Sequence, residues 1–233
     1  MAGALHEADR PKPYSVTPLR FKSVEKSEKG YLMDCGFPCR VCFRFLRDEL
    51  AKRMLEYFYE NTDVLIYDTV FKVASLRFKS ESYEELCKSV GEPVESFRLY
   101  FETPTYLASL GTEFRYLFPD HVRIFPSLMR LWNLFSDGRK FSKEEFLEYK
   151  EWLLKNVGVS QHMLKTRIAF MREKKAIGFV GWTTYEIKAM DEWNKVTQVL
   201  AKFAEYSNVG GNRTGGFGVV QLREKRRERS KCS

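Results

Sequence analysis

The chain has 233 residues, of which 44% are hydrophobic and 15% aromatic, and this composition excludes an intrinsically disordered protein. Lys and Arg number 39 against 31 Asp and Glu, so the net charge of +8 favours a polyanionic partner. The sequence has no signal peptide and no apolar run near the ~18 residues that a membrane-spanning helix needs. It therefore predicts a soluble, cytoplasmic protein with two domains of about 110 residues each.

The first half of the chain predicts a helix remnant followed by strand, strand, helix and strand. Pro11 and Pro13 end a helical pattern at residues 1–8, and alternation predicts a strand at 14–22. A turn at Lys29-Gly30 leads into a second strand, which is broken at 36–38 and alternates cleanly over 40–46. A helix follows at 48–59 and a strand at 71–78. The helix is expected to be capped by Asp48 and to bury one stripe, made of Leu50, Met54, Leu55 and Phe58.

The second half repeats this order with nothing missing. Strands are expected at 96–101, 164–172, 177–187 and 217–223, and helices at 126–135, 142–154 and 191–206. Ser142 and Glu145 have the spacing of a capping box. The strands at 164–172 and 177–187 form a hairpin through residues 173–175. The resulting order, βα(α)ββαβ, is that of a ferredoxin-like unit.

These patterns predict an α+β protein of tandem ferredoxin-like (RRM-like) domains, residues 1–90 and 91–233. The first domain lacks its opening strand and most of its opening helix, which would leave an unpaired sheet edge. We expect the true start to lie upstream of Met1. A deliberate fragment, or a second chain that supplies the missing pieces, are the alternatives.

The most informative segment is residues 208–218, with five glycines, two asparagines and one arginine. Glycine lets a ligand approach the backbone closely, and consecutive N–H groups can form an anion-binding concavity, beside which Arg213 adds a charge. A helix precedes this loop and a strand follows it, which excludes the strand–loop–helix order of an ATP or NAD site. The basic tail from Arg223 to Lys231 contributes half of the net charge and is expected to guide a polyanion towards the loop.

Metal and RRM-type signals are weak. Cys35, Cys39 and Cys42 lack a fourth ligand, and Cys39 and Cys42 point to opposite faces of a predicted strand, so zinc is not expected. The sequence 177–182 matches an RRM aromatic signature only loosely and lacks its leading basic residue. We therefore expect a core and hairpin role for this strand instead of base stacking.

The glycine loop and residues 5–19 together resemble the CRISPR-associated endoribonucleases of the Cas-six type, which cut precursor CRISPR RNA within its repeats. The family's loop reads roughly G-x-G, five residues, G-x-G, and then a hydrophobic strand. Gly210, Gly216 and Gly218 match three of these glycines, and Asn208 stands at the first. The resemblance covers nearly the whole chain, from Leu5 to about Leu222, and it implies an RNA-processing enzyme.

The resemblance also implies roles for single residues. His6 matches the family's acid–base histidine, and Lys12 matches a lysine that stabilises charge on the phosphate. A tyrosine that some members use would lie before Met1. His121, in an expected surface turn, and His162, before a strand, are predicted to be structural. The residues expected to bind RNA are Asn208, Gly210, Gly211, Asn212, Arg213, Gly215, Gly216, Gly218, Lys165 and Arg167, although a merely solvated sheet face explains the last two equally well.

The implied reaction is metal-independent attack of the 2′-OH on the adjacent phosphodiester, which leaves a 2′,3′-cyclic phosphate and a 5′-OH. No cofactor is implied. The implied partner is CRISPR repeat RNA; subunits of a CRISPR effector complex and a homodimer are further candidate partners, and no membrane is implied. The alternative function is a non-catalytic RNA-binding subunit of a CRISPR ribonucleoprotein complex, which would not need His6 and Lys12.

Overall fold

The computed structural model describes residues 11–22, 25–27, 30–33, 36–66, 69–109, 111–171 and 174–224. The expected helix at 1–8, His6 and the basic tail beyond Glu224 lie outside these residues. Within the described residues, no helix is long and apolar enough to cross a lipid bilayer.

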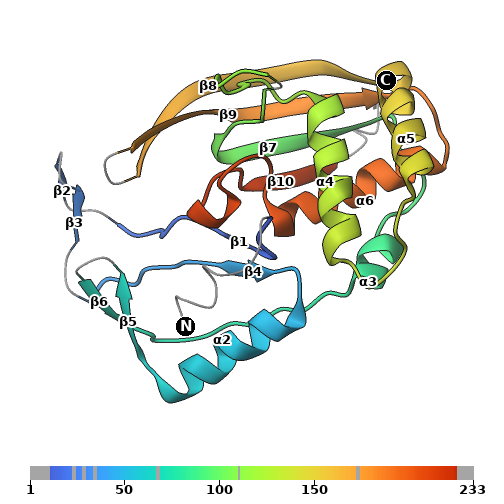
Figure 1. The fold of residues 1–233 in the computed structure, drawn as a ribbon. Coiled ribbons are helices and arrows are strands. Elements are labelled where there is room, and N and C mark those ends of the chain that lie inside the picture. The colour runs from blue at the N-terminus through green and yellow to red at the C-terminus, as the bar shows by residue number, and fades with distance from the viewer. Residues whose placement is uncertain are drawn as a thin grey trace, which may run out of the picture.

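The second half of the chain forms a four-stranded antiparallel sheet with the helices gathered on one face (Figure 1). The strands are β7 (Ser96–Thr105), β8 (Val157–Met171), β9 (Lys174–Ile187) and β10 (Val220–Glu224), in the spatial order β10-β7-β9-β8. The helices are α4 (His121–Phe135), α5 (Lys143–Asn156) and α6 (Glu192–Ser207). This order is that of a ferredoxin-like unit, so the predicted fold is confirmed.

Strict alternation along β7 separates the two faces of this sheet. Phe97, Leu99 and Phe101 are buried against the helices, whereas Arg98 and Tyr100 point to the opposite face. The rings of Phe97 and Phe125 meet edge to face at 5.9 Å between centroids, which joins β7 to α4. The core therefore lies between the sheet and its helices, and no helix in the described part of the chain covers the other face of the sheet, called the helix-free face below.

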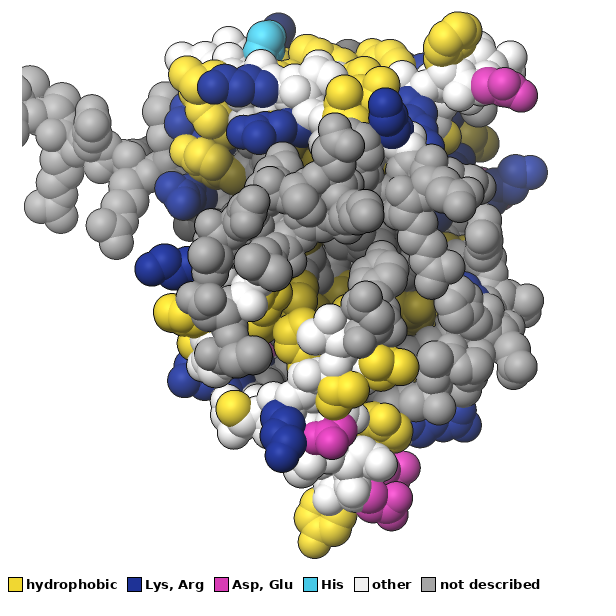
Figure 2. Space-filling view, turned by 90° about the vertical axis from the view of Figure 1, so that its left-hand side faces the viewer, with side chains coloured by type: hydrophobic (Ala, Val, Ile, Leu, Met, Phe, Trp, Pro, Cys, Tyr) yellow, Lys and Arg dark blue, Asp and Glu magenta, His cyan; other side chains and the backbone are white. Residues whose placement is uncertain are grey.

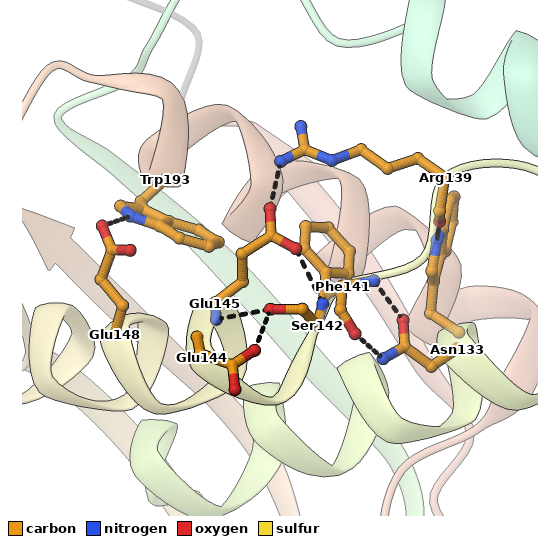
Figure 3. A network of polar contacts seen from close by, with 9 residues as sticks. Asn133, Arg139, Phe141, Ser142, Glu144, Glu145, Glu148 and Trp193 are labelled. Carbon is orange, nitrogen blue, oxygen red and sulfur yellow. Dashed lines mark hydrogen bonds and ion pairs between the residues drawn. The ribbon is translucent and has the colours of Figure 1, made fainter.

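Polar contacts fix the start of α5 against α4 and α6 (Figure 3). The expected capping box is present, because Ser142 Oγ accepts from the backbone N–H of Glu145 while the Glu145 carboxylate accepts from that of Ser142. Asn133 exchanges two hydrogen bonds with the backbone of Phe141, and Trp193 Nε1 donates to Glu148 at 3.0 Å. The three helices are thus tied together at one end of the core.

The described residues of the first half of the chain form short two-stranded pieces and two helices. The strands are β1 (Tyr14–Val16), β2 (Glu25–Ser27), β3 (Gly30–Leu32), β4 (Phe43–Phe45), β5 (Asp63–Ile66) and β6 (Thr69–Lys72), which pair as β1–β4, β2–β3 and β5–β6. The helices are α2 (Asp48–Glu60) and α3 (Tyr83–Lys88). Most side chains of this half are partly exposed, and its buried apolar residues include Leu46, Ala51 and Leu86.

Several boundaries differ from those expected. Asp48 is the first residue of α2 and Arg47 occupies the cap position, while Leu55 is 39% exposed instead of buried. The strand predicted at 71–78 ends at Lys72, and β5 and α3 were not predicted. His121 begins α4 instead of lying in a surface turn, because Asp120 caps that helix by accepting from the Val122 N–H. His162 lies within β8, which starts at Val157.

Candidate functional site

The glycine loop, residues 208–218, leaves α6 with a backbone that only glycine and asparagine adopt easily. Asn208 and Asn212 have φ values of 56° and 54°, and Gly210, Gly216 and Gly218 are also positive. A Cβ atom on Gly218 would lie 1.8 Å from the carbonyl oxygen of Val209, and one on Gly210 would lie 2.2 Å from that of Tyr106. Here glycine is required because the chain passes directly against its own backbone.

Asn208 is fully buried and holds the loop closed. Its side-chain amide nitrogen lies within hydrogen-bonding distance of the carbonyl oxygens of Val16, Arg213 and Phe217, at 3.0–3.2 Å. Its amide oxygen accepts from Arg44 Nη1 at 2.9 Å. Asn208 therefore links both ends of the loop to β1 and β4 of the first half of the chain.

Arg213 is turned inwards, with 8% of its surface exposed. Its guanidinium donates from Nη1 to the Ser207 carbonyl at 2.8 Å and from Nη2 to the Lys12 carbonyl at 3.0 Å. Burial lowers the pKa of Arg213 to about 10, because removal from water disfavours the charged guanidinium. In this position the side chain binds backbone carbonyls; its predicted contact with phosphate stays a prediction.

The segment from Lys12 to Val16 lies against the glycine loop. Ser15 is buried and its Oγ donates to the carbonyl of Tyr206 at 2.5 Å, just before the loop begins. The Tyr14 hydroxyl lies beside the Thr214 side chain, and burial raises the pKa of Tyr14. The backbone of Lys12 thus lies against the loop, whereas His6 lies outside the described residues, so the catalytic roles of both stay predictions.

Lys165 and Arg167 occupy a different surface. Both are exposed on β8, and they lie two residues apart with no bulge between them, so they share one face. That face is the helix-free face, which no helix of the described residues covers. The glycine loop adjoins the end of β7 instead, where the Gly211 N–H donates to the Tyr106 carbonyl at 3.0 Å.

The remaining histidines and cysteines make no cluster in the described part of the chain. His121 is half-buried and burial lowers its pKa, and His162 packs edge to face on Phe118 at 5.6 Å. No group of three His, Cys, Asp or Glu side chains among the described residues could hold a metal ion. Cys39, Cys42 and Cys87 are free thiols.

Three side chains of this site were missed from the sequence. Tyr14 contacts Thr214, Arg44 binds Asn208, and the ring of Tyr106 lies where a Cβ on Gly211 would fall, 2.3 Å from its Cε2. Strand alternation could have placed Arg44 beside a neighbouring strand. It could not have shown which loop that strand would meet, 164 residues later.

Comparison with known proteins assigns the chain to a family. The model of the CRISPR-associated endoribonuclease Cas6 family matches residues 99–220, which is more than half of the chain and includes most of the sheet and the glycine loop. The chain belongs to the Cas6 family. A curated relative, the CRISPR-associated endoribonuclease Cas6 of Streptococcus thermophilus, is 26% identical over 130 residues. That match spans 56% of this chain and about half of the relative, 51%.

Solved Cas6 structures share the fold over nearly the whole chain. Thermus thermophilus Cas6, solved as a product complex, superposes with a TM-score of 0.79 at 22% identity, over 95% of this chain and 86% of that one. A Cas6-related protein from Pyrococcus furiosus gives a TM-score of 0.51 at 13% identity, over 92% and 79%. The likeness to Cas6 structures therefore includes the first half of this chain, which the family model does not match.

Proposed function

We propose that this chain is a metal-independent endoribonuclease that cleaves precursor CRISPR RNA within its repeats. The proposal is supported by membership of the Cas6 family and by the product complex of the Thermus relative. The observation that carries it is the contact between the amino-terminal segment and the glycine loop. The Arg213–Lys12 and Ser15–Tyr206 hydrogen bonds hold residues 12–15, which include the candidate catalytic Lys12, against the loop expected to bind RNA.

The proposed reaction uses the substrate's own nucleophile. The 2′-oxygen bonds to phosphorus while the bond from phosphorus to the 5′-oxygen breaks, so one product ends in a 2′,3′-cyclic phosphate and the other begins with a 5′-OH. His6 transfers a proton, either from the 2′-OH or to the leaving 5′-oxygen, because imidazole titrates near neutral pH. Lys12 stabilises the negative charge that builds on the non-bridging oxygens. Holding the two oxygens in line supplies much of the rate.

We expect the glycine loop to bind RNA mainly through its backbone. The Arg213 guanidinium is bound to carbonyl oxygens, so the groups left to meet phosphate are backbone N–H groups and the exposed positions of the loop. RNA stems are recognised mainly through shape and phosphates, which suits such a surface. A homodimer, association with effector-complex subunits and a cytoplasmic location stay predictions, which light scattering, co-purification and imaging of a tagged protein would test.

The decisive experiment compares His6→Ala with His162→Ala, which changes an exposed histidine of β8. Each protein is given its cognate repeat RNA in excess EDTA. We expect His6→Ala to lower the cleavage rate by about 100-fold or more while RNA affinity is retained, and His162→Ala to cleave normally. Mass spectrometry of the wild-type product should find a cyclic phosphate at its 3′ end. Loss of wild-type cleavage in EDTA would refute the metal-independent mechanism.

Lys12 is tested in the same assay. Lys12→Ala should slow cleavage by about 100-fold, because the charge opposite the phosphate is removed, whereas Lys12→Arg should retain much of the rate. Lys52→Ala, on the exposed face of α2, is the matched control. If the wild-type chain binds repeat RNA tightly but never cleaves it, the alternative of a non-catalytic RNA-binding subunit replaces the nuclease.

A further inference from the structure

The helix-free face of the four-stranded sheet carries an ordered grid of side chains. Residues paired across antiparallel strands point to the same side, so the register defines the rows. One row crosses all four strands as Gln221, Tyr100, Trp182 and Met163. The next row contains Arg223, Arg98, Thr184 and Gln161, and Lys165 and Arg167 continue the face along β8. Tyr100 and Trp182 thus lie side by side on the two central strands.

Each of these two rings is accompanied by an arginine. The Arg98 guanidinium lies over Trp182 at 3.9 Å from the ring centroid, and that of Arg223 lies over Tyr100 at 4.4 Å. Arg98 is held in place because its Nε donates to Thr184 Oγ1 at 2.9 Å and its Nη2 to Gln161 Oε1 at 3.3 Å. A hydrogen bond from Arg98, with the added charge of Arg223, lowers the pKa of Tyr100.

The face is positively charged and open to solvent. Within the described residues no carboxylate lies within ion-pair distance of its four cations, which are Arg98, Arg223, Lys165 and Arg167. Of the carboxylates on this face, Glu102 is bound to Arg20 and Glu186 is exposed. Met163 is 59% exposed, and both aromatic rings are half-buried. Figure 2 views the molecule from the side on which the β8–β9 hairpin turns, and Lys and Arg side chains are prominent in its upper part.

This combination fits an unpaired nucleotide chain better than it fits a protein or a duplex. Bases are flat and stack on aromatic rings or on guanidinium planes, while the phosphates between them are attracted to nearby cations. A ring on each of the two central strands of a βαββαβ sheet is the arrangement by which such sheets stack neighbouring bases of single-stranded RNA. Phe179 of β9 is buried in the core, as the sequence predicted, but Trp182 of the same strand is on this outer face.

We propose that the helix-free face is a second RNA site, which stacks about two unpaired bases on Tyr100 and Trp182 and binds their phosphates through Lys165 and Arg167. The site takes single-stranded RNA and lies apart from the glycine loop. It rests on the proposed function only in that RNA is the ligand. Any base can stack on an aromatic ring, so this face would add affinity for an unpaired part of the substrate. It would not distinguish one RNA sequence from another.

The test uses the fluorescence of the full-length protein during titration with an eight-nucleotide oligouridine, which cannot form a duplex. Of the four tryptophans, Trp132 and Trp152 are buried and Trp193 is half-buried with its Nε1 bound to Glu148, so a stacked base should quench Trp182 most. We expect quenching in the wild type and its loss in Trp182→Phe, which keeps a ring and most of the affinity. Trp182→Ala and Tyr100→Leu should each weaken binding about tenfold.

Tyr59→Leu is the matched control for Tyr100→Leu, since Tyr59 is 93% exposed on α2 and away from this sheet. Circular dichroism and thermal melting establish that each variant is folded, and Tyr100→Leu remains informative if Trp182→Ala is unfolded. Unchanged affinity in Tyr100→Leu, or the same quenching in Trp182→Phe as in the wild type, overturns the proposal. His6→Ala separates the two proposals, because this variant should lose cleavage and keep the quenching of Trp182. A wild-type protein that shows the quenching but does not cleave RNA would contradict only the proposed nuclease activity.

Discussion

The glycine loop and the helix-free face of the sheet use the same kinds of residue in opposite ways. In the loop, the side chains of Arg213 and Asn208 turn inwards and donate hydrogen bonds to backbone carbonyl oxygens, so these side chains support the fold. On the sheet, Arg98 and Arg223 lie over aromatic rings at the surface. An arginine beside glycines therefore need not be a ligand contact, because the partners of the guanidinium decide whether it supports the fold or meets a ligand.

The largest expected effect tests the packed state of the loop. Gly218→Ala should destabilise the protein by about 3 kcal/mol or more, because the added Cβ would lie 1.8 Å from the Val209 carbonyl oxygen at a φ of 68°. Thermal and urea unfolding measure the change. Gly138→Ala is the control, since a Cβ there meets nothing within 4 Å. A Gly218→Ala protein as stable as the wild type would mean that the loop is not packed as described.

The second test concerns the inward arginine. Arg213→Ala should lower the free energy of unfolding by about 3 kcal/mol, since the carbonyls of Ser207 and Lys12 would lose a charged donor inside the protein. Arg223→Ala, which removes an exposed arginine, should change it by less than ~0.5 kcal/mol. Urea titration of both variants measures the two changes in unfolding free energy. Equal changes would contradict the view that Arg213 supports the fold whereas Arg223 does not.

A third test uses pH to probe buried hydroxyls of the core. Burial raises the pKa values of Tyr149 and Tyr185 above the ordinary tyrosine value of about 10. Because these pKa values are higher in the folded than in the unfolded state, their stabilising contribution is complete below about pH 10 and is lost as the pH rises further. Tyr149→Phe should therefore flatten the decline of unfolding free energy between about pH 10 and 11. Tyr59→Phe, at an exposed site, should leave the decline unchanged.

Substitutions on the helix-free face of the sheet should have the smallest effect on stability but a clear effect on RNA binding. Replacing Lys165 and Arg167 together by Gln should change the unfolding free energy by less than ~0.5 kcal/mol. It should nevertheless reduce the salt dependence of RNA affinity, by about 0.7 in the logarithmic slope for each phosphate that is no longer neutralised. Fluorescence anisotropy at several salt concentrations measures this slope. Arg213→Lys, tested beside it, should leave the slope as it is in the wild type.

The sequence predicted the second half of the chain well because its signals are local. Alternation at Phe97, Leu99 and Phe101, together with the capping box at Ser142, defines elements whose partners also carry strong patterns. The first half was predicted poorly for a physical reason. Alternation over 71–78 favours an extended backbone, but a strand also needs a hydrogen-bonded neighbour, and β6 has one only from Thr69 to Lys72.

The candidate site was predicted in part. The glycines and the amino-terminal segment were identified from sequence, because left-handed backbone and family motifs are visible there. The direction of Arg213 was not, since its burial depends on a carbonyl 201 residues earlier. The pairing of Tyr100 with Trp182 likewise depends on the register of β7 against β9, which alternation alone leaves open.

The hydrogen bonds of Asn208 and Arg213 to Val16 and Lys12 bear on any attempt to divide this protein. A piece containing only residues 91–233 would keep the donors of both side chains but lack those two acceptors from the other half. In the isolated piece water would replace the two lost acceptors, so the net contribution of these hydrogen bonds, about 0.5–1.5 kcal/mol each, would be lost. The two halves should consequently melt in a single cooperative transition, and dissection at the boundary between them should give a fragment less stable than the intact chain.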